Sequence, residues 1–276
     1  MKLLRYGPAG QEKPGLLDEG NILRDLSAHV ADIGPDTLDP HTLDRLRALD
    51  PADLPAVEEA PRLGSPIARP SNILCIGLNY RAHVAEAGMT LPTEPVVFSK
   101  HTGALSGPND VVRLPRGSNK TDWEVELAVV IGSRAQGVRE ANALGHVAGY
   151  TVCNDVSERT FQLERGGQWI KGKSADTFCP LGPVLLTADS VPDPQALRLW
   201  LSVNGETMQD GTTADMVFTV AHLVSYLSGF MTLLPGDVIA TGTPVGTGMG
   251  RGVFLKRGDV MRLGIDGIGT LEQRVE

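Results

Sequence analysis

Glycine and proline interrupt this chain at short intervals, and that spacing limits the folds that are open to it. Among the 276 residues are 32 glycines and 19 prolines, spread along the chain without a repeat period. The apolar runs between them are short, as in residues 73–78, 125–131 and 149–153. Short apolar runs bounded by turn-forming residues are typical of β-strands. We therefore expect a mixed α+β fold that is rich in strands and turns and poor in helix.

A proline-rich segment divides the chain into two predicted parts. Five prolines lie within residues 51–70, and proline at that density excludes a continuous helix or a central strand. Before this segment, three strands and one helix are expected over residues 2–6, 14–17, 21–26 and 42–49. The sequence thus predicts a small N-terminal α/β domain with a proline-rich linker over residues 1–65, followed by a larger domain over residues 66–276.

Periodicity and turn chemistry predict further elements in the larger part. Residues 81–88 favour a helix that ends at a glycine. Apolar residues spaced three and four apart follow Thr219, a good N-cap residue, so we expect a helix between Thr219 and Gly229. The dipeptide of Asn204 and Gly205 lies between two strand-like runs and predicts a β-hairpin.

The charge balance restricts the classes of partner. The chain carries 25 Lys and Arg against 33 Asp and Glu, so its formal net charge is 25 − 33 = −8. Non-specific nucleic-acid binding needs clustered Lys and Arg that displace counterions, so we expect no nucleic-acid partner. An anionic substrate would need local positive charge of its own.

Hydropathy and cysteine content favour a cytoplasmic protein. We find no apolar stretch near the start that would suit a signal peptide, and no run of about 20 apolar residues, so we expect no membrane partner. The three cysteines, Cys75, Cys153 and Cys179, have no zinc-ligand spacing. Sparse cysteines in odd number are typical of buried thiols in a reducing compartment.

The most informative stretch covers residues 121–130, where carboxylates alternate with apolar residues. Because strand side chains alternate between faces, Asp122, Glu124 and Glu126 share one face, which turns apolar from Ala128 onwards. Like charges this close repel one another unless a cation lies between them. The pattern is typical either of a solvent-exposed strand face or of a metal site at the mouth of a buried strand.

A further carboxylate, Asp155, follows the apolar run 149–153. An aspartate at the end of a strand is typical of a cap for the next turn, and it is also a common metal ligand. With Glu124 and Glu126 it makes an all-oxygen set, which suits Mg²⁺, Mn²⁺ or Ca²⁺ and disfavours zinc and copper.

From about residue 70 to the C-terminus, the sequence resembles the fumarylacetoacetate hydrolase family. Five motifs match the family in order, the second of them a Glu-x-Glu motif, at residues 77–86, 122–132, 154–162, 171–178 and 241–248. The first part of the chain is similar to the small N-terminal domain that many members carry. The resemblance implies a fumarylacetoacetase-like β-roll as the catalytic domain, and it implies a homodimer.

The same resemblance implies a metal centre and a catalytic pair. Glu124, Glu126 and Asp155 would bind Mg²⁺ or Mn²⁺, and His83 with Glu86 would activate water, on a short helix that closes over the site. The spacing agrees, because residues three apart share a helix face, and a carboxylate beside a histidine fixes its tautomer and raises its basicity. An isolated His-x-x-Glu is otherwise typical of an ordinary surface pair.

Substrate contacts are implied at four positions. Arg159, Gln162 and Lys173 would contact the substrate, and Thr243 would hold its carboxylate. Lys173 is also expected to be catalytic, because it would help to hold the enolate that forms when the bond breaks. Three carboxylates around one divalent ion leave a net negative charge, so nearby cations such as Arg159 and Lys173 are needed for an anionic substrate. Lys173 matches the family position, whereas Lys171 is expected to face solvent.

The activity that the resemblance implies is hydrolysis of the C3–C4 bond of a 2,4-diketo acid (an acylpyruvate), in which water attacks the C4 carbonyl. Residues 1–15 resemble members that cleave 2,4-diketo-3-deoxy-L-rhamnonate or -L-fuconate to pyruvate and lactate. The hydroxyl groups of such a substrate need polar partners, for which Lys100, His101 and Gln168 are candidates.

Several other functions are compatible with the same residues. The enzymatic ones are hydrolysis of another acylpyruvate such as fumarylpyruvate or acetylpyruvate, ureidoglycolate lysis, and decarboxylation of oxaloacetate. Decarboxylation would use the same enolate-stabilising groups without an attacking water. Outside enzymes, a non-catalytic organic-acid-binding protein would be stabilised by its ligand without turnover.

Overall fold

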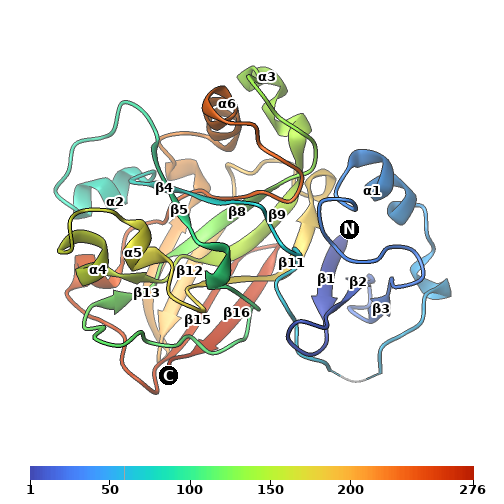
Figure 1. Cartoon of the computed structure of the whole chain (residues 1–276), viewed down its shortest axis with the longest axis horizontal. Helices are drawn as coiled ribbons and strands as arrows, with labels where there is room; N and C mark the ends of the chain where they lie inside the picture. Colours follow the sequence, from blue (N-terminus) through green and yellow to red (C-terminus); the bar gives the residue numbers. More distant parts are fainter. Residues whose placement is uncertain (59) are drawn as a thin grey trace.

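The computed structural model describes residues 1–58 and 60–276, in a mixed α+β fold dominated by β-sheets (Figure 1). The strands are β1 (Lys2–Tyr6), β2 (Lys13–Leu17), β3 (Leu23–Asp25), β4 (Ile73–Gly77), β5 (Val96–Lys100), β6 (Leu105–Ser106), β7 (Thr121–Asp122), β8 (Val125–Ile131), β9 (Val147–Asn154), β10 (Ser157–Glu158), β11 (Cys179–Thr187), β12 (Arg198–Val203), β13 (Glu206–Thr212), β14 (Val238–Ala240), β15 (Val260–Ile265) and β16 (Gly269–Arg274). The α-helices are α1 (Pro40–Arg47), α2 (Arg81–Glu86), α3 (Glu140–Ala143), α4 (Arg159–Leu163), α5 (Ile170–Lys173), α6 (Val220–Phe230) and α7 (Gly248–Arg251). Short 3-10 helices are η1 (Pro51–Asp53), η2 (Thr102–Ala104), η3 (Leu144–His146), η4 (Ala188–Ser190) and η5 (Thr213–Asp215). The strand-rich fold class expected from the sequence is confirmed.

Two larger sheets organise the strands. The first has ten strands in the order β3-β2-β1-β11-β9-β8-β14-β4-β5, with β6 paired to β11. The second has four strands in the order β13-β12-β15-β16, while β7 and β10 form a short ribbon. Strands β12, β15 and β16 lie against β8, β9 and β11, so the apolar faces of the two sheets enclose a common core.

Several elements lie where the sequence predicts them. Strand β8 has the expected bounds, and β12 and β13 form the hairpin predicted at Asn204 and Gly205, both of which have positive φ. Helix α6 begins directly after Thr219, whose side chain accepts a hydrogen bond from the backbone N–H of His222. The expected strand over residues 21–26 is shorter, because Asn21 adopts φ 59° in a turn and β3 begins two residues later.

The side-chain alternation over residues 121–130 treats this stretch as one continuous strand. That expectation is wrong in one respect, because the strand is interrupted between β7 and β8. The indole of Trp123 is fully buried and donates a hydrogen bond from Nε1 to the Gly246 carbonyl oxygen, 3.1 Å away. Asp122 pairs instead with Ser157 of β10. Trp123 thus enters the core between two buried carboxylates, Asp122 at the end of β7 and Glu124 directly before β8.

The N-terminal strands extend the large sheet. Strand β1 pairs antiparallel with β11, and β2 and β3 follow at the sheet edge. The proline-rich segment lies against these strands through isolated pairings of Ala56 with Arg24 and of Leu63 with Tyr6, and Ile67 is fully buried. The division of the chain at residue 65 stays a prediction.

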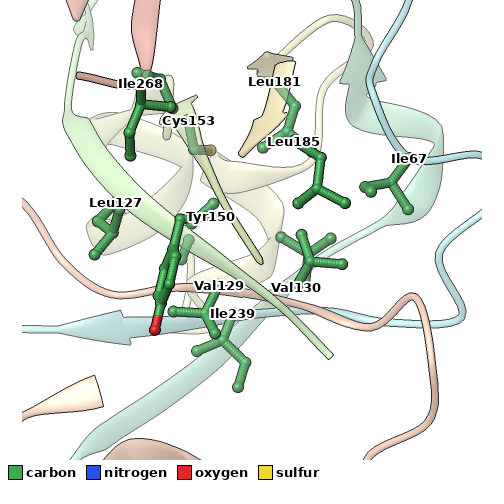
Figure 2. Packing of buried hydrophobic residues seen from close by; sticks show 14 of the residues in the cluster. Ile67, Leu127, Val129, Val130, Tyr150, Cys153, Leu181, Leu185, Ile239 and Ile268 are labelled. Carbon is green, nitrogen blue, oxygen red and sulfur yellow. The ribbon is translucent and has the colours of Figure 1, made fainter. Parts of the chain in front are cut away.

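The core lies between the sheets. Figure 2 shows side chains of β8, β9, β11 and β14 meeting Ile67 and Ile268, which come from segments far apart in the sequence. The three cysteines are buried free thiols, as expected, and the Sγ atoms of Cys153 and Cys179 are 3.8 Å apart. Burial of this apolar surface is the main stabilising contribution to the fold.

Helices α2, α4 and α5 gather at the end of the molecule that lies away from α1 and the N-terminal strands (Figure 1). They lie beside the end of β8 at which the carboxylate motif is located. Within residues 1–58 and 60–276, no helix combines the length and the hydropathy that crossing a membrane requires.

Replacing Thr219 with alanine is expected to lower the free energy of unfolding by about 1 kcal/mol, because the substitution removes the N-cap of α6. Urea unfolding followed by far-UV circular dichroism measures the change. Thr219→Ser keeps the accepting oxygen and should stay close to the unaltered protein. An equal loss in both variants would contradict the capping role.

Candidate functional site

Three carboxylates from adjacent strand ends form a buried acidic centre. Glu124 directly precedes β8, Glu126 is the second residue of β8, and Asp155 follows β9. The pairing of β8 with β9 continues through a hydrogen bond from the Asp155 N–H to the Glu124 carbonyl oxygen, 2.9 Å long. One carboxylate oxygen from each residue lies within 4.8 Å of the other two, and all three residues are buried. The solvent-exposed strand face considered from the sequence is therefore wrong for Glu124 and Glu126.

Buried cations surround this centre. The Lys173 Nζ atom donates to Glu124 Oε2 at 2.6 Å and to Asp155 Oδ2 at 2.7 Å. The Arg159 guanidinium donates to Glu124 Oε1 at 2.5 Å and holds both carboxylate oxygens of Asp122, at 2.8 and 3.0 Å. A planar guanidinium matches a carboxylate in this two-point geometry, so Arg159 is firmly oriented.

Burial and the neighbouring charges shift the pKa values of these carboxyl groups in opposite directions. Burial opposes the ionisation of Glu124, but Arg159 and Lys173 outweigh it and hold the pKa of Glu124 well below its usual value. Burial, reinforced by the carboxylates of Asp155 and Glu124, raises the pKa of Glu126 well above its usual value. Burial also raises the pKa of Asp122 to about 6, despite the opposing charge of Arg159.

The surroundings of the Glu126 carboxylate show whether the centre fits a metal ion. Its carboxylate accepts a hydrogen bond from the Gly242 N–H at 2.9 Å, and across residues 1–58 and 60–276 it forms no ion pair. A buried carboxylate beside two others, without its own cation, is costly unless a positive ion joins the cluster. The all-oxygen donor set suits a divalent cation such as Mg²⁺ or Mn²⁺, so the residues present fit the expected cofactor.

A histidine–carboxylate pair lies on the short helix α2. Nδ1 of His83 lies 3.2 Å from Glu86 Oε2, as the i, i+3 spacing predicts. Glu86 also accepts hydrogen bonds from the Gly246 N–H, at 3.1 and 3.2 Å, which attach α2 to the glycine-rich loop. If Nδ1 carries the proton that Glu86 accepts, Nε2 of His83 is left as a base.

One cavity of about 130 Å³ brings most of the predicted site residues together. The predicted residues that line it are His83, Glu124, Glu126, Arg159, Gln162, Lys173 and Thr243. Glu86 and Asp155 do not line it, but each is hydrogen-bonded to a residue that does. The cavity therefore joins the histidine pair, the acidic centre and the expected substrate contacts in one space.

The remaining predicted residues lie elsewhere. Lys100 is buried behind the centre, where its ammonium contacts Asp155 and the Val156 carbonyl oxygen, so it does not line the cavity. His101 and Gln168 are exposed outside the cavity lining. Lys171 is exposed, as the sequence predicted.

Some contributing residues carry no signal in the sequence. Phe98 and Trp169 form part of the cavity wall in an edge-to-face contact, with ring centroids 5.2 Å apart. Gly77 makes room for the indole, because a Cβ atom there would lie 2.6 Å from Trp169. Gln209 bonds Val125 and Thr243 and so fixes Thr243. Single aromatic residues and glutamines on separate elements show no spacing that a sequence pattern could detect.

The fold and the acidic centre together define a sheet-rich enzyme with a candidate divalent-metal site. The chain belongs to the fumarylacetoacetate hydrolase family, because the family model described as "Fumarylacetoacetate (FAA) hydrolase C-terminal" matches residues 72–276. A Burkholderia ambifaria protein named "Putative hydrolase" is 61% identical over 272 residues, which cover 98% of this chain and 96% of that protein.

Two solved structures show what is known of similar proteins. Maleylpyruvate hydrolase from Sphingobium sp. SYK-6, in complex with manganese(II) ion and pyruvate, is 30% identical, with a TM-score of 0.83 over 100% of this chain and 98% of that one. The 2-hydroxyhepta-2,4-diene-1,7-dioate isomerase from Mycobacterium marinum is 33% identical, with a TM-score of 0.77 over 100% of this chain and 98% of that one. Hydrolase and isomerase chemistry thus both occur on this fold.

Saturating Mg²⁺ or Mn²⁺ is expected to stabilise EDTA-treated protein. A ligand at about 100 times its dissociation constant contributes about 2.7 kcal/mol, which corresponds to roughly 5–10 °C in melting temperature for a chain of this size. Differential scanning calorimetry measures the shift.

Glu126→Gln should abolish most of that shift, because an amide removes the negative charge from the acidic centre. The matched control is Glu206→Gln, since Glu206 is an exposed glutamate at the hairpin in β13. An equal metal response in Glu126→Gln and in the control would show that the ion binds elsewhere.

Proposed function

We propose that this protein hydrolyses the C3–C4 bond of a 2,4-diketo acid and uses a divalent metal ion as cofactor. The observation that carries the proposal is that the His83–Glu86 pair and the buried carboxylates adjoin the same cavity. A base and a cation site that share one small space are what water attack on a charged keto acid requires. The hydrolase among the similar structures, which was solved with manganese(II) and pyruvate, supports the same reaction class.

The ion bound by Glu124, Glu126 and Asp155 would supply Lewis acidity and stabilise negative charge that develops on substrate oxygens. His83 takes a proton from water through Nε2, while the oxygen of that water forms a bond to C4. Glu86 holds the ring in the required orientation and stabilises its positive charge. The C3–C4 bond then breaks, so that the acyl group leaves as a carboxylate, and a proton transferred to C3 completes pyruvate.

Lys173 and Arg159 place positive charge at the buried end of the cavity, where the carboxylate of the pyruvyl group would bind. The Thr243 hydroxyl donates to the Val125 carbonyl oxygen and accepts from Gln209, so its position is fixed beside the strand. Because the amide oxygen of Gln162 accepts from Arg159, its N–H groups are the donors that face a ligand.

Among 2,4-diketo acids, we favour 2,4-diketo-3-deoxy-L-rhamnonate or -L-fuconate, which would give pyruvate and lactate. The supporting features are the resemblance of residues 1–15 to hydrolases of these sugar acids and the small size of the cavity. The acyl end of such a substrate has one methyl and one hydroxyl group and carries no charge.

The second candidate is isomerisation of a 2-hydroxydienoate, favoured by the similarity to the Mycobacterium marinum isomerase. Isomerisation moves protons between carbons without adding water. The two reactions are distinguished by whether pyruvate is released.

The direct test is to measure pyruvate and lactate released from 2,4-diketo-3-deoxy-L-rhamnonate, with Mg²⁺ and after EDTA. Equimolar products that depend on the metal are expected. Acetylpyruvate, oxaloacetate and ureidoglycolate serve as comparisons. Preference for acetylpyruvate would support the hydrolase mechanism but contradict the sugar-acid assignment. No reaction with either 2,4-diketo acid would contradict the hydrolysis itself, even if oxaloacetate or ureidoglycolate reacts.

His83→Ala is expected to lower kcat by about 10²–10⁴, because it removes the general base, while the metal-induced rise in melting temperature is retained. Steady-state pyruvate release and calorimetry measure the two effects separately. His41→Ala, at an exposed histidine of α1, is the matched control and should keep full activity. Full turnover in His83→Ala would contradict the assignment of the base.

A further inference from the structure

The two ends of the cavity differ in polarity. At the buried end are Lys173, Arg159 and Glu124, which are 2%, 4% and 5% exposed. Met89 and Leu163 are the most exposed residues of the lining, at 55% and 46%, and we therefore place the mouth of the cavity beside them. A 2,4-diketo acid bound with its pyruvyl end among the buried charges would therefore place its acyl group toward the mouth.

Apolar side chains form the wall around that acyl group. They come from the loop after α2, from β5, from the end of α4, from the residue before α5 and from α7. The residues are Met89, Phe98, Leu163, Trp169 and Met249. The two aromatic rings contact each other edge to face, which gives this side of the cavity a defined shape.

Across the described parts of the chain, residues 1–58 and 60–276, the only lysine and arginine that line the cavity are Lys173 and Arg159, and both are bonded to the acidic centre. Arg165 and Lys171 follow Leu163 and Trp169 by two residues each, but their side chains make other contacts. Arg165 lies over the Phe161 ring, 4.1 Å from its centroid, and the Lys171 ammonium donates to the Arg165 carbonyl oxygen. Neither lines the cavity.

From this arrangement we infer that the enzyme selects acylpyruvates whose acyl group is uncharged and rejects those that carry a second carboxylate. The inference rests on the proposed function, because it identifies the acyl end of the same substrate. A carboxylate buried against the apolar wall would lose its hydration without gaining a cation, whereas a methyl or methylene group would gain apolar contact. Substrate choice would thus come from rejection of the charged group as well as from attraction of the apolar one.

The test compares two acids that differ only at the last group of the acyl chain. Butanoylpyruvate ends in a methyl group, and succinylpyruvate has a carboxylate at the same place. Binding is measured by calorimetry on His83→Ala protein with Mg²⁺, so that no turnover is needed. Butanoylpyruvate is expected to bind at least about tenfold more tightly. Equal or tighter binding of succinylpyruvate, or binding of neither acid, overturns the inference.

Turnover of both acids by the unaltered enzyme separates this inference from the proposed reaction. Pyruvate from butanoylpyruvate, with at least about a tenfold higher kcat/KM than from succinylpyruvate, supports both. Tighter binding of butanoylpyruvate without pyruvate from either acid contradicts hydrolysis and still supports selection of the uncharged acyl group.

Leu163→Arg places a cation at the mouth and is expected to lower the preference for butanoylpyruvate by about tenfold or more. Leu163 is 46% exposed, so the longer side chain can reach solvent. Leu144→Arg, at a leucine of η3 that is 42% exposed and outside this cavity, should leave the preference unchanged. Met89→Lys repeats the test if Leu163→Arg does not fold, and an unchanged preference in a folded mouth variant overturns the inference.

Discussion

The mutual repulsion of buried carboxylates is the constraint on which the rest of this structure depends. Asp122, Glu124, Glu126 and Asp155 come together where β7, β8 and β9 end, and each is removed from water. Such a cluster is stable only with compensating positive charge, which Arg159 and two lysines supply in part. Within the described residues Glu126 has no cation of its own, and the pKa of its carboxyl is raised by burial and by its acidic neighbours, so the centre is a candidate site for a divalent ion.

The sheet supplies the precision that this charge balance needs. Antiparallel pairing of Val125 with Asn154 brings Glu124 beside Asp155, although they lie some thirty residues apart. The glycine-rich loop then reaches the centre from a third direction, through the Gly242 N–H on Glu126. The strand ends hold the three carboxylates of the acidic centre, while the His83–Glu86 pair lies on a short helix attached to that loop. In the proposed mechanism, the groups that would bind the ion and the group that would move a proton are therefore supported separately.

Under the proposed function, the two ends of the cavity would have different roles in binding an acid. The buried end would bind the keto-acid group, which the substrates of a diketo-acid hydrolase share. The mouth is built from loops and short helices, and its side chains can change without disturbing the strands. In this chain Leu163 and Met89 make that mouth apolar, so under the inferred selectivity the part of the site that would discriminate among acids is separate from the part that would carry out the chemistry.

The sequence by itself determined the strand-rich fold class, the bounds of β8, the hairpin at Asn204 and the cap at Thr219, because each depends on local periodicity or turn chemistry. It also identified the family motifs that contain the acidic centre. It missed the interruption at Trp123 and the aromatic wall, and it assigned Lys100 to the substrate instead of to Asp155. Only the tertiary structure decided these, because burial of a single ring or a single ammonium depends on contacts between segments far apart in the chain, which leave no repeating pattern in the sequence.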